Sequence, residues 1–116
     1  MIVGIQGTKS FNDYTIFLRA MGTALSSMED GDEEITILSV GPSQINSFGM
    51  EFSNISERSL KARGIKIKFR KVPPSLLKEQ IHTLDYFVFL SKPKEPLSEL
   101  VELADAKNIE VGVYRY

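Results

Sequence analysis

Residues 1–14 read MIVGIQGTKSFNDY, and they contain in order an apolar segment, a glycine turn and the start of an amphipathic run. Ile2 to Gln6 is a short apolar segment typical of a buried strand, and the amphipathic run begins near Asn12. A helix that begins beside such a turn directs unpaired N–H groups and the positive end of its dipole toward the turn. We therefore predict an anion-binding turn, which is made by Gly7, Thr8, Lys9 and Ser10.

The turn matches neither of the two common phosphate-binding patterns, GxGxxG and GxxxxGK(S/T). The sequence therefore predicts where a ligand binds without identifying the ligand. A second interpretation stays open, in which the segment is an ordinary strand-to-helix turn. In that case Gly7 adopts a positive φ and Ser10 serves only as a helix cap.

Strand and helix patterns alternate along all 116 residues. The predicted strands are Ile2 to Gln6, Glu34 to Val40, Ile65 to Phe69, Tyr86 to Leu90 and Ile109 to Tyr114. The predicted helices carry four apolar stripes, namely Tyr14, Phe17, Leu18, Met21, Leu25 and Met28; Phe48, Phe52, Ile55, Ser59 and Ala62; Leu76, Leu77 and Ile81; and Leu97, Leu100, Val101 and Ala104. This alternation predicts one α/β domain over residues 1–116, a Rossmann-like three-layer sandwich around a five-stranded parallel sheet.

Capping residues set the predicted helix boundaries. Ser10 to Asp13 has the composition of a capping box before the first helix, and Gly64 is suited to end the second. The pair Pro73-Pro74 is predicted to open the third helix, and Pro96 the fourth.

The third predicted strand sets the strand order. Its sequence, Ile65-Lys66-Ile67-Lys68-Phe69-Arg70, alternates with period two, whereas three of the other strands are nearly continuous apolar runs. One face of this strand is therefore in water, and its lysines discourage edge-to-edge pairing. We predict the order 3-2-1-4-5, which puts this strand at an edge. The flavodoxin-like order 2-1-3-4-5 would bury its charged face under helices at a high cost.

A second predicted ligand-binding segment follows the second strand, at the same edge of the sheet as the glycine turn. The loop from Gly41 to Gly49 is longer than the usual two to six residues of such a connection, and long loops at this edge are commonly functional. We predict that Gly41 and Ser43 face the glycine turn across a bound ligand. Ser91, after the fourth strand, reaches the same edge. An irregular loop without function is the alternative.

The net charge of −1 hides a strong segregation of charge along the chain. Seven cations and no acid lie between positions 58 and 71, whereas five acids and no cation lie between positions 29 and 34. We predict one basic face that contacts RNA or a protein partner, made by Arg58, Lys61, Arg63, Lys66, Lys68 and Arg70. A solvated face that merely protects the sheet edge is the alternative.

Composition argues against several classes of function. The chain has no cysteine and a single histidine, His82, so it lacks disulfides, thiolate chemistry and a multi-histidine metal site. No nucleophile has a base placed near it, and Glu51 is the only acid near the second loop. No apolar stretch reaches the roughly 20 residues of a membrane span, and no signal-peptide pattern is present. We expect a cytoplasmic protein without catalytic activity, cofactor or metal, and its oligomeric state stays open.

The opening residues resemble those of the SLOG superfamily, and in particular its small YspA-like, DUF2493-type members. These begin with a strand that is followed by Gly-Ser-Arg and then Phe-x-Asp-Tyr, which corresponds to residues 5–14 here. Ser39-Val40-Gly41-Pro42 and Lys61-Ala62-Arg63-Gly64-Ile65 resemble later parts of the same pattern. The resemblance implies a Rossmann-like module of order 3-2-1-4-5 that binds a nucleotide, an ADP-ribose-like molecule or another phosphate-bearing ligand.

Three departures limit what this resemblance implies. Lys9 stands where the family has arginine, and Gly41-Pro42-Ser43 stands in place of Gly-Gly-Ala. The PGGxGTxxE signature of the phosphoribohydrolase branch is missing. The hydrolase activity of that branch is therefore not implied.

A second resemblance concerns the size of the chain and its end. The cysteine-free chain that ends in Tyr114-Arg115-Tyr116 resembles small early proteins of T-even-type bacteriophages, which include a modifier of valyl-tRNA synthetase. This resemblance implies a second class of function, an accessory protein in the host cytoplasm. Such a protein would bind a host enzyme, such as an aminoacyl-tRNA synthetase, or its tRNA through the basic face.

Overall fold

The protein is described over residues 1–116 by a computed structural model with alternating strands and helices. The strands are β1 (Ile2–Gly7), β2 (Glu34–Ser39), β3 (Lys66–Lys71), β4 (Tyr86–Ser91) and β5 (Glu110–Arg115). The helices are α1 (Tyr14–Leu25), α2 (Ser43–Ala62), α3 (Pro74–Glu79) and α4 (Glu99–Ala106), and a short 3-10 turn, η1 (Ile81–Thr83), follows α3. No helix has both the length and the apolar character needed to cross a membrane.

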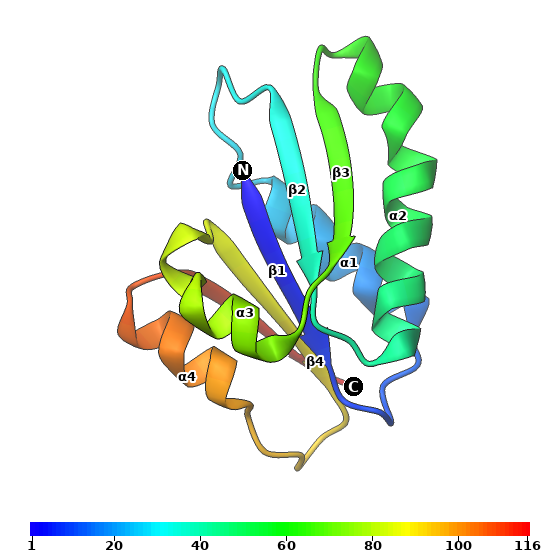
Figure 1. The fold of residues 1–116 in the computed structure, drawn as a ribbon. Coiled ribbons are helices and arrows are strands. Elements are labelled where there is room, and N and C mark those ends of the chain that lie inside the picture. Colours follow the sequence, from blue (N-terminus) through cyan, green and yellow to red (C-terminus); the bar gives the residue numbers. More distant parts are fainter.

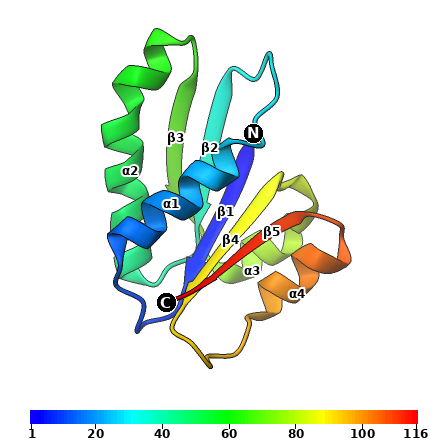
Figure 2. The same ribbon diagram turned by 180° about the vertical axis from the view of Figure 1, so that it is seen from behind.

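The five strands form one parallel sheet in the order β3-β2-β1-β4-β5 (Figures 1 and 2). This confirms the predicted fold class and strand order. β1 lies in the centre, between β2 and β4, and β3 lies at one edge. Along β3 the charged side chains of Lys66, Lys68 and Arg70 are exposed, and Ile67 and Phe69 are half-buried. The period-two pattern of this strand thus reports its edge position correctly.

Helices cover the two faces of the sheet unequally. α1 and α2 pack on one face, where Val3, Ile5, Ile35 and Ile37 contribute to the larger apolar core. On the other face, α3, η1 and α4 pack against Phe87 and Phe89 of β4 to form a smaller core. Figure 1 views the molecule from the side of α3 and α4, and it shows these helices in front of the β4 half of the sheet. Most of β3 is left uncovered on that face.

Several predicted helix features are wrong in detail. α2 begins at Ser43, so the loop expected from Gly41 to Gly49 does not exist. Ile45 and Leu60 are buried on α2, whereas Ile55 is 65% exposed. The predicted stripe fails there because the inward face is set by contacts with β1 and β3 that the local pattern does not contain.

The cap of α1 lies within the predicted segment from Ser10 to Asp13, whereas the start of α4 differs from the prediction. Asp13 caps α1, since its carboxylate accepts a hydrogen bond from the backbone N–H of Ile16 at 3.1 Å. α4 begins after Ser98 rather than at Pro96, and the side chain of Ser98 caps it. Leu97 therefore precedes the helix and is 41% exposed instead of facing inward. Leu18 of α1 is likewise 41% exposed.

Candidate functional site

The carboxyl ends of the strands bring the predicted ligand-binding turns together, as the strand order requires. The backbone N–H of Gly7 donates to the carbonyl of Gly41 at 3.0 Å, and the N–H of Thr8 donates to the carbonyl of Leu90 at 3.0 Å. The glycine turn therefore touches both the segment after β2 and the end of β4. These two amides are already paired within the backbone, so they are not free to bind an anion.

A carboxylate from a third loop lies in the glycine turn. Glu95, between β4 and α4, accepts hydrogen bonds at Oε1 from the hydroxyl of Thr8 at 2.7 Å and from the backbone N–H of Lys92 at 2.5 Å. The hydroxyl of Ser10 lies 2.9 Å from each oxygen of the same carboxylate. The bond from Thr8, followed by that from Lys92, lowers the pKa of Glu95 below its ordinary value. The turn thus holds an oxyanion that belongs to the protein itself, and the binding of an external anion there stays a prediction.

Gly7 is required for close packing. A Cβ atom at this position would lie 2.6 Å from two side-chain carbons of Ile45 and 3.2 Å from the carbonyl oxygen of Leu90. Gly7 does not have a positive φ, since the glycines that do are Gly31, Gly41 and Gly64. The interpretation of Gly7 as a residue with positive φ is therefore wrong. Its missing side chain lets α2 approach the end of β1.

The remaining predicted ligand residues are placed less favourably. Lys9 and Ser43 are exposed, and neither side chain forms a hydrogen bond or salt bridge with another residue of the protein. Gly41 has a φ of 91°, which favours glycine. Ser91 is fully buried, and its hydroxyl has no hydrogen-bond partner. A ligand above the turn therefore does not reach Ser91 in this conformation.

The main cavities lie away from the glycine turn. The largest, of about 800 Å³, is lined by the acidic segment from Glu29 to Glu33, by apolar residues such as Leu25 and Leu60, and by Arg63. A second, of about 430 Å³, follows the edge of the sheet along β3 and is lined by Glu57, Lys61, Lys66 and Lys68, among others. Neither is lined by residues of the glycine turn. No group of acidic or histidine side chains is arranged to hold a metal ion.

The basic surface comprises seven exposed cations, Arg58, Lys61, Arg63, Lys66, Lys68, Arg70 and Lys71. The sequence led us to expect that these cations form one basic face, but they do not all lie on the same face of the sheet. Phe69 contacts α2 through Gly49, so α2 lies on the side of Ile67 and Phe69. Side chains alternate along a strand, so Lys66, Lys68 and Arg70 point to the opposite, uncovered side. The two groups of cations meet only around the open edge of β3, where Lys61, Lys66 and Lys68 line the same cavity.

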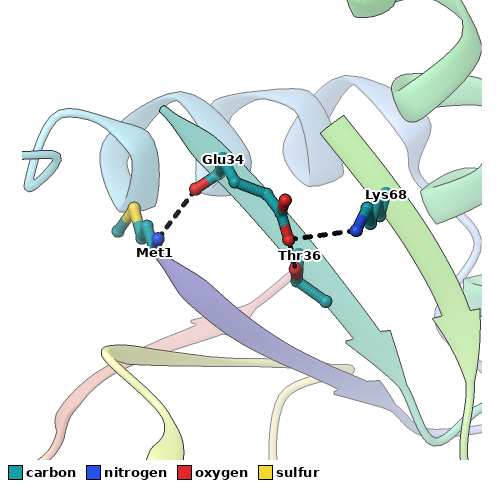
Figure 3. Close-up of polar contacts among 4 residues, drawn as sticks. All are labelled: Met1, Glu34, Thr36 and Lys68. Atoms are coloured by element: carbon teal, nitrogen blue, oxygen red, sulfur yellow. Dashed lines mark hydrogen bonds and ion pairs between the residues drawn. The ribbon is translucent and has the colours of Figure 1, made fainter. Parts of the chain in front are cut away.

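Only one cation of the basic surface has an acidic partner. Lys68 Nζ lies 3.4 Å from Glu34 Oε1, and that oxygen also accepts a hydrogen bond from the hydroxyl of Thr36 at 3.3 Å (Figure 3). The N-terminal amine of Met1 donates to the backbone carbonyl of Glu34 at 2.8 Å (Figure 3). The other salt bridge of the protein, Lys78 with Glu99, lies elsewhere. Six of the seven cations thus have no carboxylate within 4 Å.

Comparison of the chain with protein-family models, with curated proteins and with solved structures gave no match in any of the three. The fold and the geometry of its surface therefore carry the functional argument by themselves. The implications of the SLOG and phage-protein resemblances stay expectations.

The sequence did not predict Glu95 as part of the site. It belongs to the turn Lys92-Pro93-Lys94-Glu95, and its hydroxyl partners lie more than 80 positions earlier in the chain. One signal was available, because the predicted order places the loop after β4 beside the end of β1. Glu95 is the one acid in the segment from Ser91 to Ser98, so it is the carboxylate nearest in sequence to that edge.

Proposed function

We propose that this protein is a binding module that contacts the phosphate backbone of RNA, alone or in a nucleoprotein complex, through the basic surface. The observation that carries the proposal is the group of six exposed cations without a carboxylate partner. Unpaired surface cations favour polyanions, because each phosphate that they neutralise releases condensed counterions. A cation that already pairs with a carboxylate of the protein gains less binding free energy from a phosphate.

The row Lys66, Lys68 and Arg70 supports this proposal by its geometry. Alternate residues of a strand lie on one face about 6.6 Å apart, so the three side chains form a line on the uncovered side of the sheet. Such a line can contact several phosphates of one strand at the same time. The basic surface has few exposed aromatic side chains on which bases can stack, so we expect little sequence preference.

The test is the salt dependence of RNA binding, measured by fluorescence anisotropy with a labelled tRNA and a labelled single strand. We expect log K to fall with log salt by about 0.7–0.9 for each phosphate neutralised. Reversal of Lys66, Lys68 and Arg70 to glutamate should weaken binding and reduce that slope by roughly 2–3, since three contacts are lost.

The matched control changes the same charge elsewhere. Arg19, Lys107 and Arg115 are exposed and belong to neither candidate site, and their reversal to glutamate alters the net charge equally. We expect this control to keep most of the salt slope. Equal loss in both triple variants, with both folded by circular dichroism, would show that only net charge matters and would overturn the proposal.

A second candidate function concerns the glycine turn. We propose as the alternative that Thr8, Lys9 and Ser10, with Gly41 and Ser43 opposite, bind a phosphate-bearing small molecule such as a nucleotide or an ADP-ribose-like ligand. The observation that favours it is the carboxylate of Glu95, which the two hydroxyls of the turn already bind. Calorimetry with a nucleotide panel tests it. Lys9→Ala should cost about 1.5–3 kcal/mol of binding free energy, whereas unchanged affinity would contradict this assignment.

A further inference from the structure

The segment from Lys92 to Ser98, which we call the strap, connects β4 to α4 across the carboxyl edge of the sheet. It is fixed to the first loop by the contacts of Glu95 with Thr8 and Ser10. It is fixed again at its end, where the hydroxyl of Ser98 donates to Gln6 Oε1 at 2.6 Å. Only side chains tie the strap to β1 and its turn, so these links can open without loss of any strand pairing.

The donors around Glu95 suit oxyanions in general. Two hydroxyls and one backbone N–H converge on a single carboxylate, and all three are neutral donors from the chain. The same two loops contain three lysines, Lys9, Lys92 and Lys94. Their total positive charge exceeds the single negative charge of Glu95. Removal of that carboxylate would leave these donors and lysines without their negative partner. Phosphate oxygens accept the same hydrogen bonds as a carboxylate.

The strap also holds Glu95 with some strain. The backbone N–H of Glu95 closes a turn on the carbonyl of Lys92 at 3.4 Å, and Lys94 adopts a φ of 73° within that turn. Residues other than glycine and asparagine rarely adopt this left-handed conformation, which is strained for a lysine. The bonds of Glu95 to the glycine turn help to offset this cost. A competing anion would therefore also relieve the strained turn.

We propose that Glu95 is an internal ligand of an oxyanion site formed by Thr8, Ser10 and the N–H of Lys92, and that a phosphate group displaces its carboxylate and so releases Glu95 from the glycine turn. The inference rests on the second candidate function and is independent of the basic surface. Glu95 is accessible to solvent, so an external anion can reach the site without prior opening of the core.

The experiment titrates inorganic phosphate, AMP and adenosine into the wild type and the Glu95→Ala variant, with amide chemical shifts as the readout. We expect the variant to bind phosphate and AMP at least tenfold more tightly than the wild type, with shifts at Thr8, Ser10 and Lys92. Adenosine, which lacks a phosphate, should bind neither protein. Comparison of phosphate with AMP distinguishes the free anion from a phosphomonoester as the natural source.

Two further variants make the result specific. Addition of Thr8→Val and Ser10→Ala to Glu95→Ala should abolish the gained binding. Glu99→Ala removes a carboxylate just after the strap, at the first residue of α4, which pairs with Lys78 rather than with the turn, and it should behave as the wild type does. If Glu95→Ala does not fold, Glu95→Gln, which keeps the size of the side chain, replaces it in each titration.

The other outcomes distinguish failure of the second candidate function from failure of the proposed role of Glu95. Equal phosphate affinity of the wild type and the Glu95 variants, with shifts at the turn, would leave the second candidate function standing and overturn the role of Glu95. Absence of binding to all of them would overturn both. Shifts confined to Lys66, Lys68 and Arg70 would assign phosphate to the basic surface and likewise overturn the inference.

Discussion

Ser91 combines complete burial with a hydroxyl group that has no hydrogen-bond partner. A buried hydroxyl loses its bonds to water on folding, and nothing in the protein replaces them. We expect Ser91→Ala to raise the free energy of unfolding by about 1 kcal/mol, as measured by urea denaturation.

The control for this change is Ser98→Ala in the same part of the chain. The Ser98 hydroxyl donates to Gln6 at 2.6 Å and accepts from the N–H of Val101 at 3.4 Å. Its removal should lower the free energy of unfolding by about 1 kcal/mol. A loss of stability in Ser91→Ala would mean that its hydroxyl has an internal partner such as an ordered water.

Glu95 should make the stability of the protein depend on pH. Its folded pKa is lowered, first by the Thr8 hydroxyl and then by the Lys92 amide, so its stabilising effect is fully present above the ordinary pKa of 4.5. The effect is lost as the pH falls through the lower, folded pKa. We expect the difference in unfolding free energy between the wild type and Glu95→Gln to be larger at pH 7 than at pH 3.

Thr8→Val provides the matching background for this measurement. It keeps the shape of the side chain and removes the hydroxyl that lowers the pKa of Glu95 most. When Thr8→Val is present, the effect of Glu95→Gln on the free energy of unfolding should vary less with pH. An equal pH dependence of the Glu95→Gln effect with and without Thr8→Val would show that the Thr8 hydroxyl does not cause it.

At the scale of the elements, α2 is positioned by small residues where it approaches the sheet. Gly7 of β1 leaves room for Ile45, and Gly49 of α2 leaves room for Phe69 and Ile5. We expect Gly7→Ala to lower the free energy of unfolding by about 1–3 kcal/mol, because its Cβ would overlap the fully buried Ile45.

Gly22→Ala is the control for a glycine without a packing role. Gly22 lies within α1, and a Cβ there would meet no atom within 4 Å. Alanine should stabilise the helix by about 0.5–1 kcal/mol at this position. Chemical denaturation of both variants tests the pair, and stabilisation by Gly7→Ala would show that α2 shifts away at no cost.

The strands were easier to predict from the sequence than the helices. Each strand is a short run of apolar or alternating residues, and all five lie within one or two residues of their predicted positions. The start of α2 was missed because Ser43, Gln44, Asn46 and Ser47 have the composition of a loop. Ile45 carries the decisive contact, with Gly7, and such a contact between distant segments is not visible in local sequence.

At the scale of the whole molecule, the edge position of β3 followed from one physical fact, the cost of burying lysines. The same reasoning located the glycine turn beside the segments after β2 and β4, and the structure brings them together there. It could not place Glu95, whose bonds depend on the path of the strap. Nor did it separate the cations of α2 from Lys66, Lys68 and Arg70 of β3, which point to the opposite side of the sheet.

The central place of β1 has a consequence for synthesis on the ribosome. Residues 1 to 72 supply β1, β2 and β3 with α1 and α2, whereas β4 begins only at Tyr86. Until then one side of β1 has no neighbour, and the apolar residues Val3 and Ile5 sit on an open strand edge, which invites pairing with other chains. A translational pause between Val72 and Tyr86 would lengthen this exposure, whereas rapid passage or a chaperone that covers the nascent edge would protect the chain from aggregation.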